Sequence, residues 1–480
     1  MGKRSCRNAA AQPFLGDPSM LLNIYYRYSA YLSAGDVRTG SITETERWRM
    51  IKTACLLPLI ISVLFAQTDS LPLDLSGWVR VAMENSPNID ISSADLMSAE
   101  ASLTSSESFL WPRLSLSSSA AHSWSSVPDI SGGYTDIDNA SWSMSASVSQ
   151  EILASGGSSW LRLSGSRHSL DASGFDMDQA RLDLTMDVVE AYYGVIEDVQ
   201  LLVSSRRAMD RSTEQLRRTK ALYEIGGVTN LELIQAEVQQ STDNLALLRR
   251  EQAVSNSYTT LYQTAGVIGT EYRVNTNAVL QPVSIAAAMN YNLDMSGNNS
   301  IASSIERITA AEYTCEANRR AYWPSLNAGG SWNWSNDELD FEDFSDRDSW
   351  RVSLTLSWTL FDGFSRESII QSSRASVLRQ QASHEALMNS IKSFILTAQN
   401  NLISSIRSWE LSLEVLNQAN EKLRLSRMSY DLGSIPLLDL LDAQSSVTSA
   451  EASVESSRTS CLIAEARLLV LLGRTPRVGE

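Results

Sequence analysis

The sequence predicts an α+β membrane protein in which short strands and very long helices are arranged in two repeated halves. Three observations support this prediction. The chain is internally duplicated, its four predicted strands alternate apolar with small polar residues, and its predicted helices are far longer than those of an ordinary domain. Together they favour one elongated body over two or three separate globular domains.

The duplication is clearest where residues 223–237 and residues 430–444 read alike, at a shift of 207 positions. The same shift holds without a gap over the longer ranges 156–266 and 363–473. A unit of this size that occurs twice is a half-protein, not a short solenoid repeat. We therefore expect each half to contribute the same order of strands and helices.

Composition narrows the class of protein. The chain has 480 residues and a net charge of −16, which disfavours nucleic acid as a partner. Its three histidines and four cysteines do not fall at metal-ligand spacing, and it has no phosphate-binding loop, nucleophile elbow or zinc-binding histidine pair. The sequence thus predicts no enzyme, no cofactor and no metal. Cys315 and Cys461 are expected to be core residues, and a disulfide between them is left open.

A segment near the N-terminus has the features of a secretory signal peptide. Residues 50–66 place Lys52 before a short apolar run, which is too short and too lightly flanked for a spanning helix. Residues 1–49 precede this signal, so we interpret them as a non-native N-terminal extension. The predicted parts that follow are a first repeat at 67–266, a linker with a short equatorial segment at 267–297, a second repeat at 298–473 and a tail at 474–480.

Four strands are predicted, at residues 113–125, 141–153, 325–335 and 349–361. Alternate positions in each are apolar, and the positions between them are mostly serine, threonine or asparagine. A period of two is typical of a strand with one apolar and one polar face. Residues 127–139 are rich in glycine, aspartate and serine, and are predicted to form a loop.

Tryptophans gather at or near the ends of these strands, and we call this set the aromatic belt: Trp111, Trp124, Trp142, Trp323, Trp332, Trp334, Trp350 and Trp358. Strands of about 9–11 residues with an apolar outer face, a polar inner face and flanking aromatics are typical of an outer-membrane barrel. A small soluble sheet gives no reason for tryptophans in two bands. Four strands cannot close a barrel, and lipid does not tolerate an open edge, so several chains must share one barrel.

The helices are predicted at residues 75–85, 94–109, 167–222, 301–322 and 363–430. At about 1.5 Å per residue, the last of these is about 100 Å long. Each half then reverses direction at a glycine-containing tip and continues in a further helix. The residues of the two tips are Gly226, Gly227, Gly433 and Ser434.

Two carboxylates stand just inside the helix that follows the second tip. Asp439 and Asp442 are three residues apart, so they share one face of that helix. Like charges stacked in this way are unfavourable unless the face meets water, cations or a partner. A solvated helix start, with acids near its positive end, is the simpler interpretation and stays open.

The arrangement resembles the outer-membrane efflux proteins, the TolC family. The similar features are the duplicated strand–strand–long-helix unit, the proline after the helix that leads into each strand pair, the Trp-Thr-Leu-Phe-Asp-Gly run at 358–363, and Leu-Asp-Leu-Leu-Asp-Ala-Gln at 438–444. The resemblance implies a homotrimer with a twelve-stranded β-barrel in the outer membrane and a long periplasmic α-helical barrel. It further implies an exit duct for a tripartite efflux or type I secretion system, whose tips meet a periplasmic adaptor protein and an inner-membrane pump.

The resemblance also implies roles for single residues at the tips. Asp439 and Asp442 match the acidic rings of a periplasmic gate, Tyr430 the tyrosine that ties the inner hairpin to its neighbour, and Glu232 its acidic partner. Ile435 stands where similar proteins have an arginine, so one closing ionic link is expected to be missing. The alternative function is a non-transport periplasmic coiled-coil scaffold or adhesin. The sequence does not identify the exported substrate.

Overall fold

A computed structural model describes residues 71–128, 130, 132–267, 272–276, 281–291, 293–337 and 348–477. The proposed extension 1–49 and the signal segment 50–66 lie outside these residues. The described elements, in chain order, are β1 (Leu71–Leu73), α3 (Leu75–Asn85), α4 (Pro87–Glu107), η1 (Ser108–Leu110), β2 (Arg113–Pro128), β3 (Tyr134–Leu153), α5 (Ser158–Glu224), α6 (Asn230–Thr264), β4 (Tyr272–Val274), α7 (Ile285–Met289), α8 (Asn299–Arg319), η2 (Arg320–Tyr322), β5 (Ser325–Asn336), β6 (Asp348–Ser357), α9 (Ser365–Asp431) and α10 (Leu437–Leu471).

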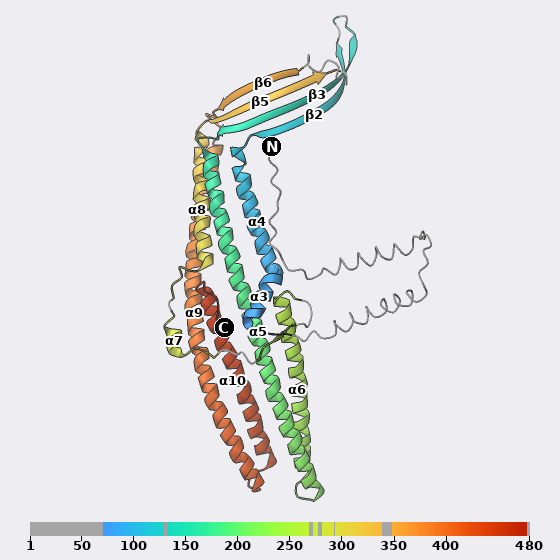
Figure 1. The fold of residues 1–480 in the computed structure, drawn as a ribbon, viewed down its shortest axis with the longest axis vertical. Helices are drawn as coiled ribbons and strands as arrows, with labels where there is room; N and C mark the ends of the chain where they lie inside the picture. Colours follow the sequence, from blue (N-terminus) through green and yellow to red (C-terminus); the bar gives the residue numbers. More distant parts are fainter. Residues whose placement is uncertain are drawn as a thin grey trace, which may run out of the picture. The chain divides into compact units, whose positions relative to one another are not determined.

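The main sheet lies at one end of the long helices, and the two tips lie at the other end (Figure 1). Its strand order is β2-β3-β5-β6, and every neighbouring pair is antiparallel. On one face, serine hydroxyls pair across β2 and β3, with Oγ–Oγ distances of 2.7 Å for Ser115 and Ser147 and 2.8 Å for Ser119 and Ser143. The outer strands β2 and β6 each have one unpaired edge within the described residues.

The prediction of a loop at 127–139 is wrong. Strand β2 continues to Pro128, β3 already begins at Tyr134, and Pro128 pairs directly with Tyr134. Aspartates in this extension accept hydrogen bonds from the facing strand, as Asp136 does from Ser126. A strand of low intrinsic propensity can thus be held by its cross-strand partners.

The fourth strand is shorter than the sequence suggests. Strand β6 ends at Ser357, four residues before the expected end at 361. Trp358 instead turns its indole Nε1 toward the carbonyl oxygen of Tyr322, to which it donates a hydrogen bond of 3.0 Å. The chain here leaves the sheet and enters α9 through Phe364, which has a left-handed backbone (φ 68°).

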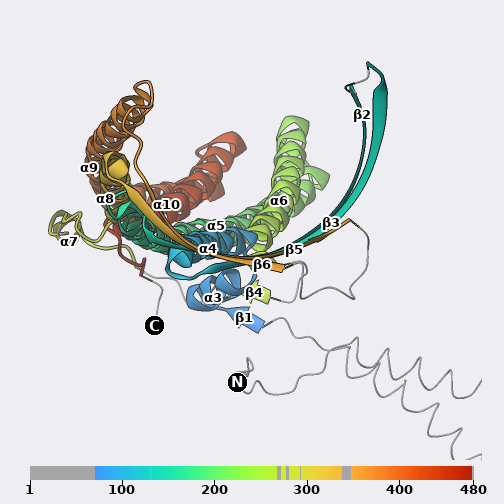
Figure 2. The same cartoon turned by 90° about the horizontal axis from the view of Figure 1, so that it is seen from above.

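The longer helices α4, α5, α6, α8, α9 and α10 form a single curved layer, seen from above in Figure 2. Next to the sheet, the order of neighbours is α4, α5, α8, α9; toward the tips it is α6, α5, α10, α9. Helices α5 and α9, of 67 residues each, run through both levels and span about 100 Å. Like the sheet, each level of this layer ends in two open edges within the part of the chain that the structure describes.

The two levels meet at an equivalent joint in each repeat. Gly266 ends α6 against the backbone of Asn85 and Ser86, where α4 begins. Gly473 ends α10 against Gly297 and Asn298, where α8 begins. Both glycines have a left-handed backbone, with φ of 70° and 71°, and a Cβ on either would overlap the facing carbonyl oxygen. The joint therefore requires glycine twice.

Two hydrophobic cores flank this joint. In one, the buried Trp78 of α3 packs its ring against Tyr262 and Tyr272. In the other, Ala288 of α7 packs on α9 and α10. The linker 267–297 thus contributes β4 to the first core and α7 to the second, and β4 pairs in parallel with β1.

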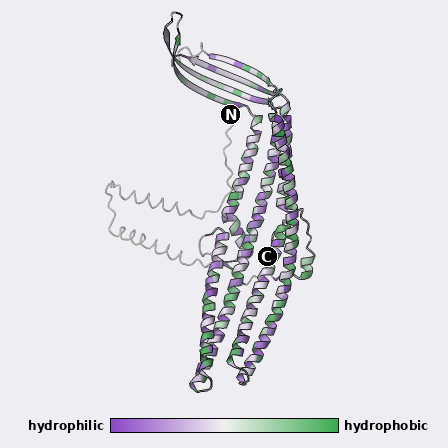
Figure 3. Cartoon of the chain, turned by 180° about the vertical axis from the view of Figure 1, so that it is seen from behind, coloured by the Kyte–Doolittle hydropathy of each residue, from purple (hydrophilic) through white to green (hydrophobic). Residues whose placement is uncertain are grey.

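Hydrophilic and hydrophobic residues are mixed along each long helix (Figure 3). Among the helices that the structure describes, none is both long enough and apolar enough to cross a membrane. Cys315 and Cys461 are both buried free thiols, which answers the question of a disulfide between them.

Candidate functional site: the hairpin tips

Each tip is a tight turn that begins with a left-handed glycine. At the first tip Gly226 has φ of 75°, and Gly227 N donates to Leu222 O at 2.8 Å. At the second tip Gly433 has φ of 71°, and Ser434 N donates to Ser429 O at 2.9 Å. A hydrogen bond that reaches back five residues past a left-handed glycine is the usual way to close a helix end.

The helices that leave the tips start in different ways. Thr229 caps α6 by accepting a hydrogen bond of 3.3 Å from the backbone nitrogen of Glu232. Glu232 therefore lies in the first turn, where its charge complements the helix dipole. The second tip uses Pro436 in extended conformation, one residue before α10.

A small apolar cluster joins the two hairpins. Leu437, Leu440 and Leu441 of α10 are buried together with Ala236 of α6. The ring of Tyr430 packs against this cluster. The acidic start of α10 is therefore held in a fixed position next to the first hairpin.

Tyr430 links the two hairpins through its hydroxyl group. It lies beside the polar side chains of Gln215 and Thr219 of α5, both of which are buried. Burial raises the pKa of Tyr430, and the negative charge of Glu232 raises it further. The structure thus brings Glu232 close enough to act through its charge. The polar side chains beside the hydroxyl group, Gln215 and Thr219, are two residues that the sequence did not predict.

Asp439 and Asp442, which were predicted to form a gate, differ in their surroundings. Asp439 is exposed and forms no ion pair among the residues that the structure describes. Asp442 accepts from Lys422 Nζ of α9 at 2.6 Å, and the same ammonium lies 3.3 Å from Ser446 Oγ. The sequence suggested two unpaired carboxylates per chain, and in the structure one of them has a cation beside it. Lys422 is 20 residues away across the hairpin, so helical spacing could not find it.

A cavity of about 310 Å³ lies between α5, α9 and α10 next to Tyr430. Its wall carries mostly charged and polar residues: Asp210, Arg211, Glu214, Gln215, Arg218, Arg427, Asp431 and Gln444. Glu214 accepts hydrogen bonds from Arg217 and Arg218, and these bonds lower the pKa of its carboxyl group to about 2. The cavity is therefore a polar, charged gap between the hairpins.

The repeat relation extends to atomic detail in this region. Arg217 Nη2 lies 2.8 Å from Glu214 Oε1, and Arg424 Nη2 lies 2.7 Å from Glu421 Oε1. These pairs are 207 positions apart in the sequence. The tips also carry an equivalent pair of exposed apolar side chains, Ile225 at 79% and Leu432 at 82%.

At the opposite end, five of the belt tryptophans are exposed: Trp111, Trp124, Trp323, Trp350 and Trp358. Trp142 and Trp332 are partly covered. Trp334 differs, since it is 1% exposed. A covered indole does not present its ring to a lipid surface, so we remove Trp334 from the aromatic belt.

The chain matches the family of outer membrane efflux proteins over residues 78–267 and 291–474, which is most of its length. It belongs to this family. It is 22% identical over 439 residues to outer membrane protein TolC of Vibrio cholerae, covering 87% of this chain and 95% of that protein. Family membership favours the channel over the alternative of an envelope scaffold.

Solved channel structures share the fold. The CmeC outer membrane channel of Campylobacter jejuni superposes with a TM-score of 0.70 at 17% identity, covering 83% of this chain and 85% of that one. The open state of the MtrE outer membrane channel of Neisseria gonorrhoeae gives 0.68 at 16% identity, covering 85% and 91%. This efflux protein is therefore an outer-membrane protein with a periplasmic helical part.

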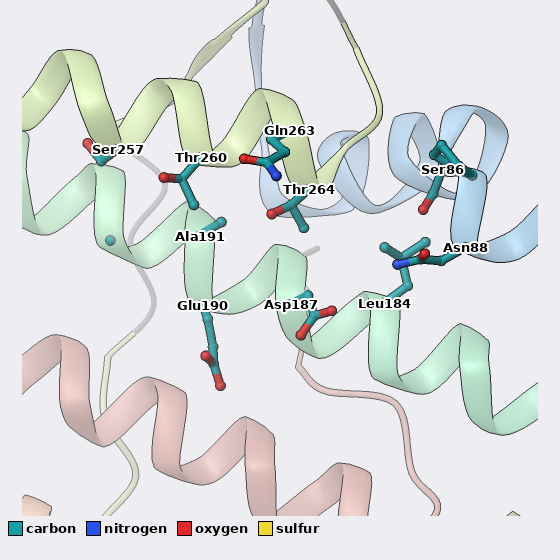
Figure 4. A pocket seen from close by; sticks show the side chains of 12 residues that line it. Ser86, Asn88, Leu184, Asp187, Glu190, Ala191, Ser257, Thr260, Gln263 and Thr264 are labelled. Carbon is teal, nitrogen blue, oxygen red and sulfur yellow. The ribbon is translucent and has the colours of Figure 1, made fainter.

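The efflux protein also has a polar groove of about 710 Å³ at the joint between α4, α5 and α6 (Figure 4). Asp187 and Glu190 of α5 line it opposite hydroxyl and amide groups of α6. Burial and the nearby carboxylates of Glu190 and Asp183 raise the pKa of Asp187. Glu190 is engaged with Arg467 of α10, whose guanidinium lies 2.7 Å away.

A second groove, of about 540 Å³, occupies the equivalent place in the second repeat. Phe394 and Thr397 replace Asp187 and Glu190, and Arg467 replaces Thr260. The duplicated halves of this efflux protein thus keep the groove and change its chemistry from acidic to apolar and basic.

Proposed function

We propose that three copies of this chain close into one channel that serves as the exit duct of an efflux or type I secretion system. The observation that carries this proposal is that every level of the chain is an open arc. The sheet has free edges at β2 and β6, and the tip-side helices have free edges at α6 and α9, within the described residues. Three arcs of four strands make a closed barrel of twelve, which removes all edges.

The exposed side chains at the helical edges support contact with a second copy of the same chain. Helix α6 exposes a row of large apolar side chains at a spacing of three, four or seven residues: Leu231, Ile234, Val238, Leu245 and Leu248. Such a row is the seam of a coiled-coil contact. We infer that it packs on α9 of the next copy, which exposes Leu411, Val415 and Leu425.

The tips are proposed to form the gate. Three copies place three exposed Asp439 carboxylates at a narrow mouth, and the three Asp442 carboxylates lie behind them with Lys422 as counter-ion. A ring of carboxylates favours cations and repels anions. Tyr430 holds the inner hairpin against α5, and Ile435 supplies no ionic link.

The outer ends of the tips are proposed to meet the periplasmic adaptor of an inner-membrane pump. Gly226, Gly227, Gly433 and Ser434 are exposed, and each turn carries one prominent apolar residue, Ile225 or Leu432. Exposed apolar side chains beside flexible glycines suit a docking contact.

The gate is tested by the double variant Asp439→Ala with Asp442→Ala. Because the carboxylates bind multivalent cations, the purified variant channel should show a higher single-channel conductance in a planar lipid bilayer and weaker block by such cations. The matched control is Asp90→Ala with Asp95→Ala, which removes two exposed carboxylates from α4. Equal conductance of the gate variant and the wild type would refute the gate. A chain that forms no pores and stays single in mild detergent would refute the duct itself.

A further inference from the structure

Three metal-ligating side chains meet between α5 and α8, far from the tips. His168 Nδ1 lies 2.6 Å from Glu306 Oε2, although the two residues are 138 positions apart. Asp171 follows His168 by three residues and so shares its face of α5. The ligand atoms of the three residues all lie within 4.8 Å of one another.

We propose that His168, Asp171 and Glu306 bind a divalent transition-metal cation of the Zn²⁺ type. An imidazole with two carboxylates suits Zn²⁺ and its first-row neighbours, whereas Ca²⁺ and Mg²⁺ prefer oxygen ligands alone. The two carboxylates balance the charge of the ion. Three protein ligands leave the fourth tetrahedral position to water.

The three ligand atoms can reach the spacing of a tetrahedral site by side-chain movements of about 1–1.5 Å. Bonds of about 2.0–2.2 Å place neighbouring ligand atoms about 3.3–3.6 Å apart. The Glu306 oxygen must therefore move away from His168 by about 1 Å, and the most distant ligand atom must approach by about 1.5 Å. Small side-chain rotations suffice, since His168 and Glu306 are only half-buried, with exposures of 31% and 26%.

The surroundings hold the histidine in place, and no lysine or arginine among the described residues forms an ion pair with Asp171 or Glu306. The ring of His168 stacks on Tyr313, with centroids 5.3 Å apart and planes 13° apart. The nearest cation on α8, Arg307, is engaged by Asp176 at 2.5 Å, and Ser303 donates to the same carboxylate. Asp171 and Glu306 also line a cavity of about 560 Å³, which gives an ion a path to the site.

The duplication provides an internal comparison. The positions equivalent to His168 and Asp171 in the second repeat are Ala375 and Leu378. The fold therefore does not require polar residues at these places in α5. A bound ion would tie α5 to α8 just below the sheet, and the proposal stands independently of the gate.

The test uses the full-length, tag-free channel in detergent, titrated with Zn²⁺ by calorimetry and with Co²⁺ by visible absorption. The wild type should bind one Zn²⁺ per chain and give the absorption of tetrahedral Co²⁺. His168→Ala and Glu306→Gln should weaken this binding at least about tenfold. The controls are the other two histidines, as His122→Ala and His384→Ala, whose rings contact Asp138 and Ser304 instead.

Three outcomes overturn the proposal: no Zn²⁺ binding by the wild type at micromolar concentration, equal binding by the His168 variant, or an equal loss in a control. Heat-modifiable migration in gels monitors whether each variant still assembles. If His168→Ala fails to assemble, the Zn²⁺ affinities of Glu306→Gln and Asp171→Asn test the proposal, because both substitutions keep the size and shape of the side chain.

Discussion

At the scale of single residues, the pairing of Lys422 with Asp442 sets the charge of the proposed gate. The pair is exposed on both sides, so its own contribution to stability is small. Its effect on the local potential is larger, because it leaves one uncompensated carboxylate per chain where the sequence alone suggested two. Selectivity at the mouth then depends on a residue of α9 as well as on the aspartates of α10.

Lys422→Ala should therefore make the channel more cation-selective. Loss of the ammonium frees Asp442 and doubles the uncompensated carboxylates at the mouth, which also strengthens block by multivalent cations. Reversal potentials in a salt gradient across a planar bilayer measure the change. Lys392→Ala is the control, since Lys392 is exposed on the same helix nearer the joint. An identical shift for both variants would point to a general effect of charge.

Tyr430→Phe should make the channel leakier to large antibiotics. The variant keeps the ring in its apolar cluster and loses the polar contacts of the hydroxyl group with Gln215 and Thr219. Susceptibility of cells that carry the variant reports the leak. The repeat supplies the control, Tyr223→Phe, at the equivalent and exposed position of the first tip. Wild-type susceptibility of the Tyr430 variant would count against the link.

At the scale of elements, the glycine joints explain how α6 continues the line of α4, and how α10 continues the line of α8. Gly266 and Gly473 let the end of one helix touch the start of the next, backbone against backbone. Asn298 strengthens the second joint by donating to Leu471 O at 2.9 Å. The four short helices α4, α6, α8 and α10 thus fill the layer beside α5 and α9 without a gap.

Gly473→Ala should destabilise the assembled channel by at least about 2 kcal/mol. A methyl group there is strained by the positive φ and overlaps Gly297. The temperature at which the oligomer dissociates in detergent gels measures the loss. Gly194→Ala is the control, because Gly194 lies inside α5 with open space around it and should be neutral or slightly stabilising. A wild-type dissociation temperature for Gly473→Ala would refute the requirement for glycine.

The sequence predicts most elements because their signals are local. Period-two alternation found the four strands, and the short helix expected at 75–85 is confirmed as α3 (Leu75–Asn85). The paired extension of β2 and β3 was not predicted, because cross-strand contacts stabilise it and its residues have low strand propensity. The partners Lys422, Gln215 and Glu306 were missed for the same reason: each contact joins different helices, and no spacing along one helix reveals it.

At the scale of the whole molecule, the open edges make assembly the decisive step. Leu245→Glu with Leu248→Glu should lower the proportion of trimer at least about tenfold, since each copy would bury two unpaired charges at the proposed contact. Light scattering in mild detergent measures the mass of the complex. Ala246→Glu is the control, as it adds a charge to an exposed position on another face of α6. An undiminished trimer in the leucine variant would place the contact elsewhere.

The unpaired edges of β2 and β6 also bear on how such a channel is made. Until partners arrive, each newly exported chain presents strand edges that accept any available strand, including those of the wrong protein. In the proposed trimer, productive closure needs three copies, so its rate depends steeply on concentration, whereas mispairing does not need a second copy of the same chain. A modest fall in the synthesis of the chain should then reduce the number of assembled channels by more than the same proportion.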